Sequence, residues 1–189
     1  MLSTASARPV FLFELPSART WHVKPDSTGD VPTIAAAIDS AQAGDEVVLA
    51  PGVYGWSSQG DDGHEFPHMI AMKTGVTLRS EAGPEATILD GEEKVSVVRC
   101  QEVGDVRIEG LTITGGSGVV GVGDGISSDG ASHPVIINCV IRNNSSSSGA
   151  GILCVGATIT VAESLTTCPF RSLEAGLAFS VSTPSSLAA

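Results

Sequence analysis

Aromatic and charged side chains are scarce in this chain of 189 residues. Aromatic residues make up only 4% and charged residues 16%, although 42% of the residues are hydrophobic. The apolar content is therefore mostly Val, Ile, Leu and Ala, and glycine occurs 22 times. Small β-branched side chains favour closely stacked strands, and glycine favours tight turns. A helical bundle would need more Leu, Glu and Lys, so the composition argues for an all-β fold.

Basic residues are also few. Ten Lys and Arg residues stand against 21 Asp and Glu residues, which gives a formal net charge of -11. A nucleic-acid-binding protein presents a basic surface to phosphates, so we expect no nucleic-acid partner. Binding to an anionic membrane surface is equally unfavourable for an acidic chain. The acidic balance suits a protein that stays in solution or takes up cations.

Long apolar segments and paired cysteines are missing from the sequence. A transmembrane helix needs about 18 or more apolar residues, and no such run occurs, so we expect no transmembrane segment. The apolar stretch 10–13 is cut off by Glu14 and Pro16, which makes a poor signal peptide. None of the cysteines forms a CxxC pair, so we expect buried free thiols, with a disulfide as the alternative in an exported protein. They are Cys100, Cys139, Cys154 and Cys168.

A strand–bend–strand unit recurs along the chain. Residues 106–113 align with residues 134–141, with apolar residues at the third, sixth and eighth positions and Gly110 or Asn138 at the bend. Stacked about 4.8 Å apart, such units bury one another's inward side chains. The pattern predicts a right-handed parallel β-helix of about five coils, with an antiparallel sandwich as the main alternative. The expected inward row is Leu49, Leu78, Ile108, Ile136 and Ile159, and further strands are expected at 70–72, 97–98, 125–126 and 151–152.

A helix is predicted over residues 33–41, after Pro32. Ile34, Ala37, Ile38 and Ala41 fall on one face of it. Because the first strand of a β-helix would otherwise expose an unpaired edge, this amphipathic helix is expected to cap the N-terminal end.

The chain divides into three expected parts. Residues 1–20 are expected to be poorly ordered, residues 21–160 to form the β-helix, and residues 161–189 to form an irregular tail. After Thr160 the aligned bend position holds Val161, and the aligned inward position holds Ser164. We therefore expect the chain to be truncated or frame-shifted there, with an ordinary irregular tail as the alternative.

Several segments resemble bacterial right-handed β-helix proteins of the pectin-lyase-like superfamily, over residues 21–160. The opening is VKPDSTGDVPTIAAAIDSAQAGDEVVLAPGVY, and the repeated coils are VTLRSEAGPEATILDG, VRIEGLTITGG and PVIINCVIRNN. The resemblance implies an extracellular, periplasmic or cell-surface protein and a polysaccharide partner. The superfamily includes polysaccharide lyases, glycoside hydrolases, esterases, epimerases and periplasmic copper-binding proteins, so the fold alone does not select an activity.

The first candidate site is the loop 55–68. Asp61, Asp62 and Glu65 can offer oxygen ligands to calcium, and His64 can add an imidazole for zinc or copper. Trp56 is the candidate for substrate binding, by stacking on a sugar ring. Acidic residues with glycine are also typical of an ordinary solvated loop.

The second candidate site contains Asp124, Asp129 and His133. Two carboxylates can act as general acid and base on a glycosidic bond, whereas a lyase would need calcium and a basic residue, for which Arg107 and Arg142 are loose candidates. Asp-Gly is also a common turn dipeptide.

The sequence motifs of the enzyme families are missing. There is no polygalacturonase-like series of Asn-Thr-Asp, Asp-Asp, Gly-His-Gly and Arg-Ile-Lys, and no pectin-esterase-like pattern. The leading hypothesis is a non-catalytic or degenerate β-helix module of a secreted or surface protein that binds carbohydrate. The alternatives are a polysaccharide lyase or glycoside hydrolase fragment acting on acidic polysaccharide, and a metal-binding periplasmic β-helix protein.

Overall fold

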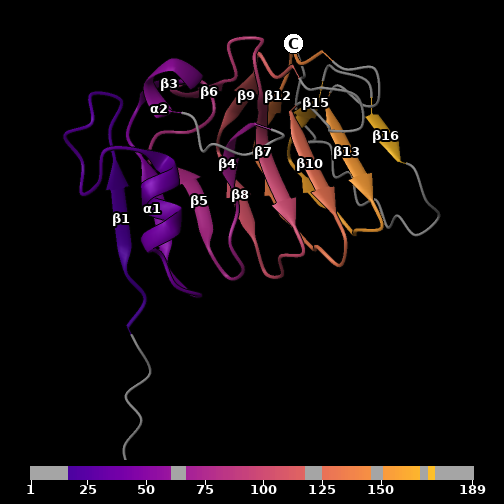
Figure 1. The fold of residues 1–189 in the computed structure, drawn as a ribbon, viewed down its shortest axis with the longest axis horizontal. Helices are drawn as coiled ribbons and strands as arrows, with labels where there is room; N and C mark the ends of the chain where they lie inside the picture. The colour runs from indigo at the N-terminus through magenta and orange to yellow at the C-terminus, as the bar shows by residue number, and fades with distance from the viewer. Residues whose placement is uncertain (1–16, 61–66, 118–124, 146–150, 167–169, 173–189) are drawn as a thin grey trace, which may run out of the picture.

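The protein is a parallel β-solenoid of about five turns. The computed structural model describes residues 17–60, 67–117, 125–145, 151–166 and 170–172. Of residues 170–172 only the backbone is described. Every strand pair in this part of the chain is parallel, and the strands stack from β1 at one end to β16 at the other (Figure 1). This arrangement confirms the predicted all-β parallel β-helix and excludes the antiparallel sandwich.

Each full coil contributes one strand to each of three sheets, and β1 adds one more strand to sheet A. Sheet A contains β1 (Thr20–Val23), β2 (Glu46–Leu49), β5 (Thr77–Ser80), β8 (Arg107–Glu109), β11 (Val135–Ile137) and β14 (Thr160–Ala162). Sheet B contains β3 (Gly52–Gly55), β6 (Thr87–Asp90), β9 (Thr112–Thr114), β12 (Val140–Ile141) and β15 (Leu165–Thr166). Sheet C contains β4 (His68–Ala71), β7 (Ser96–Gln101), β10 (Ile126–Asp129), β13 (Ile152–Val155) and β16 (Phe170–Ser172).

The core is built from rows of apolar side chains that run along the solenoid. Each coil alone cannot bury its inward residues, but stacking makes each row continuous. The main row of sheet A is offset from the predicted one at both ends, because Val47 and not Leu49 pairs with Leu78, and Val161 and not Ile159 pairs with Ile136. Leu49 and Ile159 are nevertheless buried. The observed row is Val47, Leu78, Ile108, Ile136 and Val161.

In the last three coils, the corner between sheets A and B contains a residue with a left-handed backbone. Gly110, Asn138 and Glu163 fill it, with φ of 68°, 49° and 51°. Ser164 then ties the last corner to the preceding coil, since its hydroxyl accepts the N–H of Cys139 at 3.0 Å and donates to the carbonyl of Ala162 at 2.8 Å. Strand pairing therefore continues past the predicted boundary at Thr160.

The last described coil runs to Ser172, because β14, β15 and β16 all pair with the coil before them. The residues predicted to form an irregular tail thus include strands. Glutamate seldom adopts a left-handed conformation, so the sequence pattern did not reveal the bend at position 163. Residues 1–16 and 173–189 lie outside the described residues.

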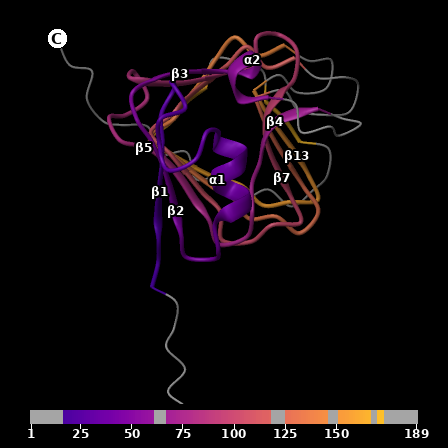
Figure 2. The same ribbon diagram turned by 60° about the vertical axis from the view of Figure 1, so that its left-hand side comes forward.

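Helix α1 (Ile34–Ser40) closes the N-terminal end, as predicted. Thr33 caps it by accepting the N–H of Ala36 at 3.1 Å. Figure 2 shows α1 lying across the end of the coil, between the strands of sheet A and those of sheet C. Its apolar face is buried against the core through Ile34, Ala37, Ile38 and Ala41.

The outer edge of β1 is blocked by a turn. The N–H of His22 donates to Oδ2 of Asp30 at 2.8 Å, and the N–H of Asp30 donates to the carbonyl of His22 at 2.7 Å. A strand edge occupied in this way cannot pair there with another chain.

Two further predictions concern helices and cysteines. Within the described ranges the longest helix is α1, with seven residues, and no helix there could cross a membrane.

Cys100, Cys139 and Cys154 are free and buried, which confirms the prediction of buried thiols for these three. Cys168 lies outside the described residues.

Candidate functional site

Four polar side chains form a block on the outer face of sheet C. Successive side chains of a strand point to opposite faces. In β7 and β10 the residues that alternate with the block are buried, namely Val98, Cys100, Ile126 and Ser128. The strand register places Arg99 beside Ser127 and Gln101 beside Asp129. We call Arg99, Gln101, Ser127 and Asp129 the sheet C site.

An ion pair crosses this block diagonally. Nη2 of Arg99 lies 3.5 Å from Oδ2 of Asp129, and the two side chains are 20% and 35% exposed. A pair that is open to water in this way contributes about 1 kcal/mol or less to stability. Its main consequence is local, because the two charges offset each other on the sheet surface.

A cavity adjoins the block. It has a volume of about 210 Å³ and is lined by His68, Ala71, Met72, Arg99 and Gln101. On the neighbouring strand, Ser127 is only 5% exposed, and among the described residues its hydroxyl has no hydrogen-bond partner. The site thus combines a recess, an ion pair, an amide and an unsatisfied hydroxyl.

The structure describes two of the three residues that were predicted to act together. Asp129 ends β10 and belongs to the sheet C site. His133 lies beyond the following turn, is exposed, and donates its backbone N–H to the carbonyl of Val103 at 3.2 Å. Of the hydrogen bonds and ion pairs described, none joins Asp129 to His133. Asp124 lies outside the described residues.

The four residues predicted to bind metal, Asp61, Asp62, His64 and Glu65, also lie outside the described residues. Elsewhere, across the described ranges, no group of three or more His, Cys, Asp or Glu side chains is arranged to hold a metal ion. Trp56 opens α2 (Trp56–Gln59) and is half-buried against the core. Its role in substrate binding stays a prediction.

Sequence reasoning missed Arg99 and Gln101. Instead, it considered Arg107 as a basic residue, but Arg107 lies on sheet A and pairs with Glu109 at 2.8 Å. A signal was present, because the 28-residue repeat that aligns Ile108 with Ile136 also places residue 99 over residue 127 and residue 101 over residue 129.

No protein-family model and no curated protein sequence matches this chain. The fold and the chemistry of the surface therefore carry the argument about function.

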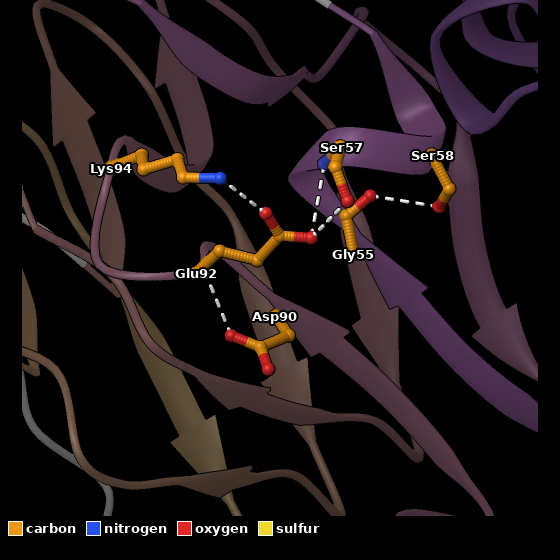
Figure 3. Close-up of polar contacts among 6 residues, drawn as sticks. All are labelled: Gly55, Ser57, Ser58, Asp90, Glu92 and Lys94. Carbon is orange, nitrogen blue, oxygen red and sulfur yellow. Dashed lines mark hydrogen bonds and ion pairs between the residues drawn. The ribbon is translucent and has the colours of Figure 1, made fainter.

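A second polar cluster surrounds Glu92 in the turn after β6 (Figure 3). Oε1 of Glu92 accepts the backbone N–H of Ser57 at 3.1 Å and its hydroxyl at 2.5 Å, while Oε2 pairs with Nζ of Lys94 at 2.7 Å. These contacts, led by that of Lys94, lower the pKa of Glu92 to about 2. We call Glu92, Ser57 and Lys94 the Glu92 clamp.

The Glu92 clamp has a structural role. It fastens the turn after β6 to α2. A Cβ atom at Gly55 would lie 2.5 Å from Oε1 of Glu92, so a larger residue there would displace the carboxylate from this position. Glu92 and Glu93 both have positive φ, 54° and 57°, a costly conformation for glutamate. Because the carboxylate is fully engaged with α2 and Lys94, the clamp offers little to a ligand.

A second cavity, of about 200 Å³, lies at the N-terminal end beside Arg19, Trp21 and Asp45. Its strongest polar groups are already paired. The guanidinium of Arg19 stacks 3.6 Å from the centre of the Trp21 ring. Asp45 accepts the N–H of Arg19, the N–H of Gln42 and the indole N–H of Trp21. Backbone N–H groups, first that of Gln42, lower the pKa of Asp45. The sheet C site is therefore the better candidate.

Proposed function

We propose that this chain is a non-catalytic, carbohydrate-binding β-helix module of a secreted or surface protein, related to the pectin-lyase-like superfamily. The observation that carries the proposal is the sheet C site, a set of outward polar side chains beside a cavity of about 210 Å³. The relationship to the superfamily rests on the resemblance of residues 21–160 together with the solenoid fold.

The surface suits an extended polymer. Neighbouring strands in a parallel sheet repeat about every 4.8 Å, so polar side chains on adjacent strands form a ladder along the solenoid. Arg99 offers donors, Asp129 acceptors and Gln101 both. Sugar hydroxyls also both donate and accept, so a saccharide can satisfy all three side chains.

The arrangement supports binding more than acid–base catalysis. A glycosidase positions two carboxyl groups on either side of the scissile bond. Here the carboxylate of Asp129 faces the guanidinium of Arg99 at 3.5 Å, and His133 lies beyond the next turn. Among the described residues, no hydrogen bond or ion pair joins Asp129 to His133, and Asp129 is engaged by Arg99 instead.

The test is a glycan-binding screen of the intact chain by affinity electrophoresis and calorimetry. The expected result is binding to at least one polysaccharide class, weakened about tenfold or more by Arg99→Ala, as expected when about 1.4 kcal/mol of binding energy is lost. The matched control is Arg79→Ala, because Arg79 forms a similar ion pair with Glu46 at 3.0 Å on sheet A.

Two outcomes would overturn the proposal. One is the absence of binding to every polysaccharide tested. The other is turnover of pectate, alginate or a related polymer, with or without calcium, that Asp129→Asn abolishes. That second result would establish the lyase or hydrolase alternative.

A further inference from the structure

We infer that the sheet C site recognises an uncharged, hydroxyl-rich saccharide and discriminates against acidic polymers. The inference rests on the proposed carbohydrate-binding function and names the ligand class of that same surface.

The local charge balance is the first reason. The site contains one cation and one anion, Arg99 and Asp129, whose side chains lie 3.5 Å apart. Gln101 and Ser127 carry no charge. A polymer of acidic sugars therefore finds no net positive charge in the block, and it must also approach a chain with a net charge of -11. An uncharged sugar meets no such repulsion.

The hydrogen-bonding inventory is the second reason. Asp129 is an acceptor only, whereas Ser127 and Gln101 both donate and accept. Within the described structure, the hydroxyl of Ser127 is buried and has no hydrogen-bond partner. A carboxylate group of a ligand can only accept, so it cannot donate to Asp129 and would face it with like charge. A sugar hydroxyl can donate to Asp129 and accept from Arg99 at the same time.

The size of the recess is the third reason. The cavity beside Arg99 and Gln101 measures about 210 Å³, below the roughly 300 Å³ at which pockets for drug-sized ligands begin. It can therefore receive one sugar ring or part of one. The remainder of the polymer would lie across the outer face of β7 and β10.

The experiment is calorimetry on the intact chain with matched neutral and acidic oligosaccharides at two salt concentrations. The neutral probes are xylo-, manno- and cello-oligosaccharides, and the acidic probes are oligogalacturonate and oligoalginate. The expected result is binding of at least one neutral probe about tenfold or more tighter than any acidic probe. Its Kd should change less than about twofold between low and high salt, because an uncharged ligand has no charge–charge attraction to the protein that salt could screen.

A specificity variant sharpens the test. Asp129→Asn leaves Arg99 without its counter-charge, so binding of the neutral probe should weaken about tenfold while binding of the acidic probes strengthens. Gln101→Ala removes one exposed amide that lines the cavity, without changing charge, and should weaken neutral binding alone. Glu46→Gln, which frees Arg79 on sheet A, is the matched control and should change neither. Equal thermal melting of the variants shows that each one is folded.

The outcomes separate this inference from the proposed function. Acidic probes that bind more tightly than neutral ones overturn the inference and leave the carbohydrate-binding function standing. If none of the three sheet C variants, including Arg99→Ala, changes the binding of the neutral probe, the sheet C site is not where the saccharide binds. Failure of every probe to bind overturns both.

Discussion

The side chain of Gln59 holds the first residue of α1. Oε1 of Gln59 accepts the backbone N–H of Ile34 at 2.9 Å, and both residues are buried. Because the first N–H groups of a helix have no partner within the helix, this bond replaces one that water would otherwise supply. Helix α2 thereby joins the N-terminal cap to the body of the solenoid.

Gln59→Ala is expected to lower the free energy of unfolding by about 1–3 kcal/mol, the usual consequence of leaving a buried donor unsatisfied. Urea denaturation measures the change. Ser58→Ala is the control, because the exposed hydroxyl of Ser58 only donates to the carbonyl of Gly55. A Gln59→Ala protein as stable as the wild type would show that the bond to Ile34 does not hold α1.

The Glu92 clamp predicts a specific dependence of stability on pH. Hydrogen bonds from Lys94 and Ser57 lower the pKa of Glu92 from its ordinary 4.5 to about 2 in the folded chain. The clamp therefore stabilises the fold fully above the ordinary value, and this contribution is lost as pH falls toward 2.

Glu92→Gln is expected to reduce stability near neutral pH by about 1 kcal/mol, a modest figure because Lys94 is largely exposed. The decline in stability on acidification should also become shallower in this variant. Denaturation midpoints measured from neutral to acidic pH test both effects. Glu85→Gln serves as a control at an exposed position, and a parallel loss in both variants would contradict the prediction.

Glu163 offers a test of the last coil. It adopts φ of 51° at the bend that Asn138 fills one coil earlier with φ of 49°. Asparagine tolerates this conformation better than glutamate, so Glu163→Asn is expected to stabilise the protein by up to about 1 kcal/mol.

Thermal denaturation measures the gain at this bend. Glu85→Asn is the control for the loss of one exposed carboxylate outside such a bend. An unchanged melting temperature for Glu163→Asn would argue that residues 160–172 do not contribute to the cooperative fold.

The buried cysteines predict a large difference in reactivity between folded and unfolded protein. Burial raises the pKa of Cys100 to about 12 and that of Cys139 to about 11, and it also raises the pKa of Cys154. Since the thiolate is the reactive form, none of the three should react with a thiol reagent until the protein unfolds.

The assay uses Cys168→Ser protein, so that only the described cysteines are counted. Rapid modification in native buffer would contradict their burial. Slow modification that accelerates with urea in step with unfolding would support it.

Much of the fold could be predicted because the inward rows consist of Val, Ile and Leu residues at nearly regular spacing. The helix could also be predicted, since Ile34, Ala37 and Ile38 fall on one face after an N-cap threonine. The strand register at the two ends could not be predicted, because Val47 and Leu49 are both apolar and both point inward. Only the pairing of neighbouring strands distinguishes them.

The site was harder to predict for a physical reason. Asp129 was recognised as a polar residue on a coil, but its partner Arg99 is 30 residues away and meets it only through the parallel register of β7 and β10. The acidic loop drew attention because of its composition, whereas the block on sheet C depends on which face each side chain occupies.

The most direct test of the central claim is to map a bound saccharide on the isotope-labelled chain by amide chemical-shift perturbation. Titration with the neutral oligosaccharide that binds most tightly should shift the amides of β7 and β10 around Arg99, Gln101, Ser127 and Asp129, and leave those of sheet A unchanged. Shifts that are confined to another sheet or to the N-terminal cavity, or that are absent at saturating saccharide, would contradict the claim that the outer face of sheet C binds carbohydrate.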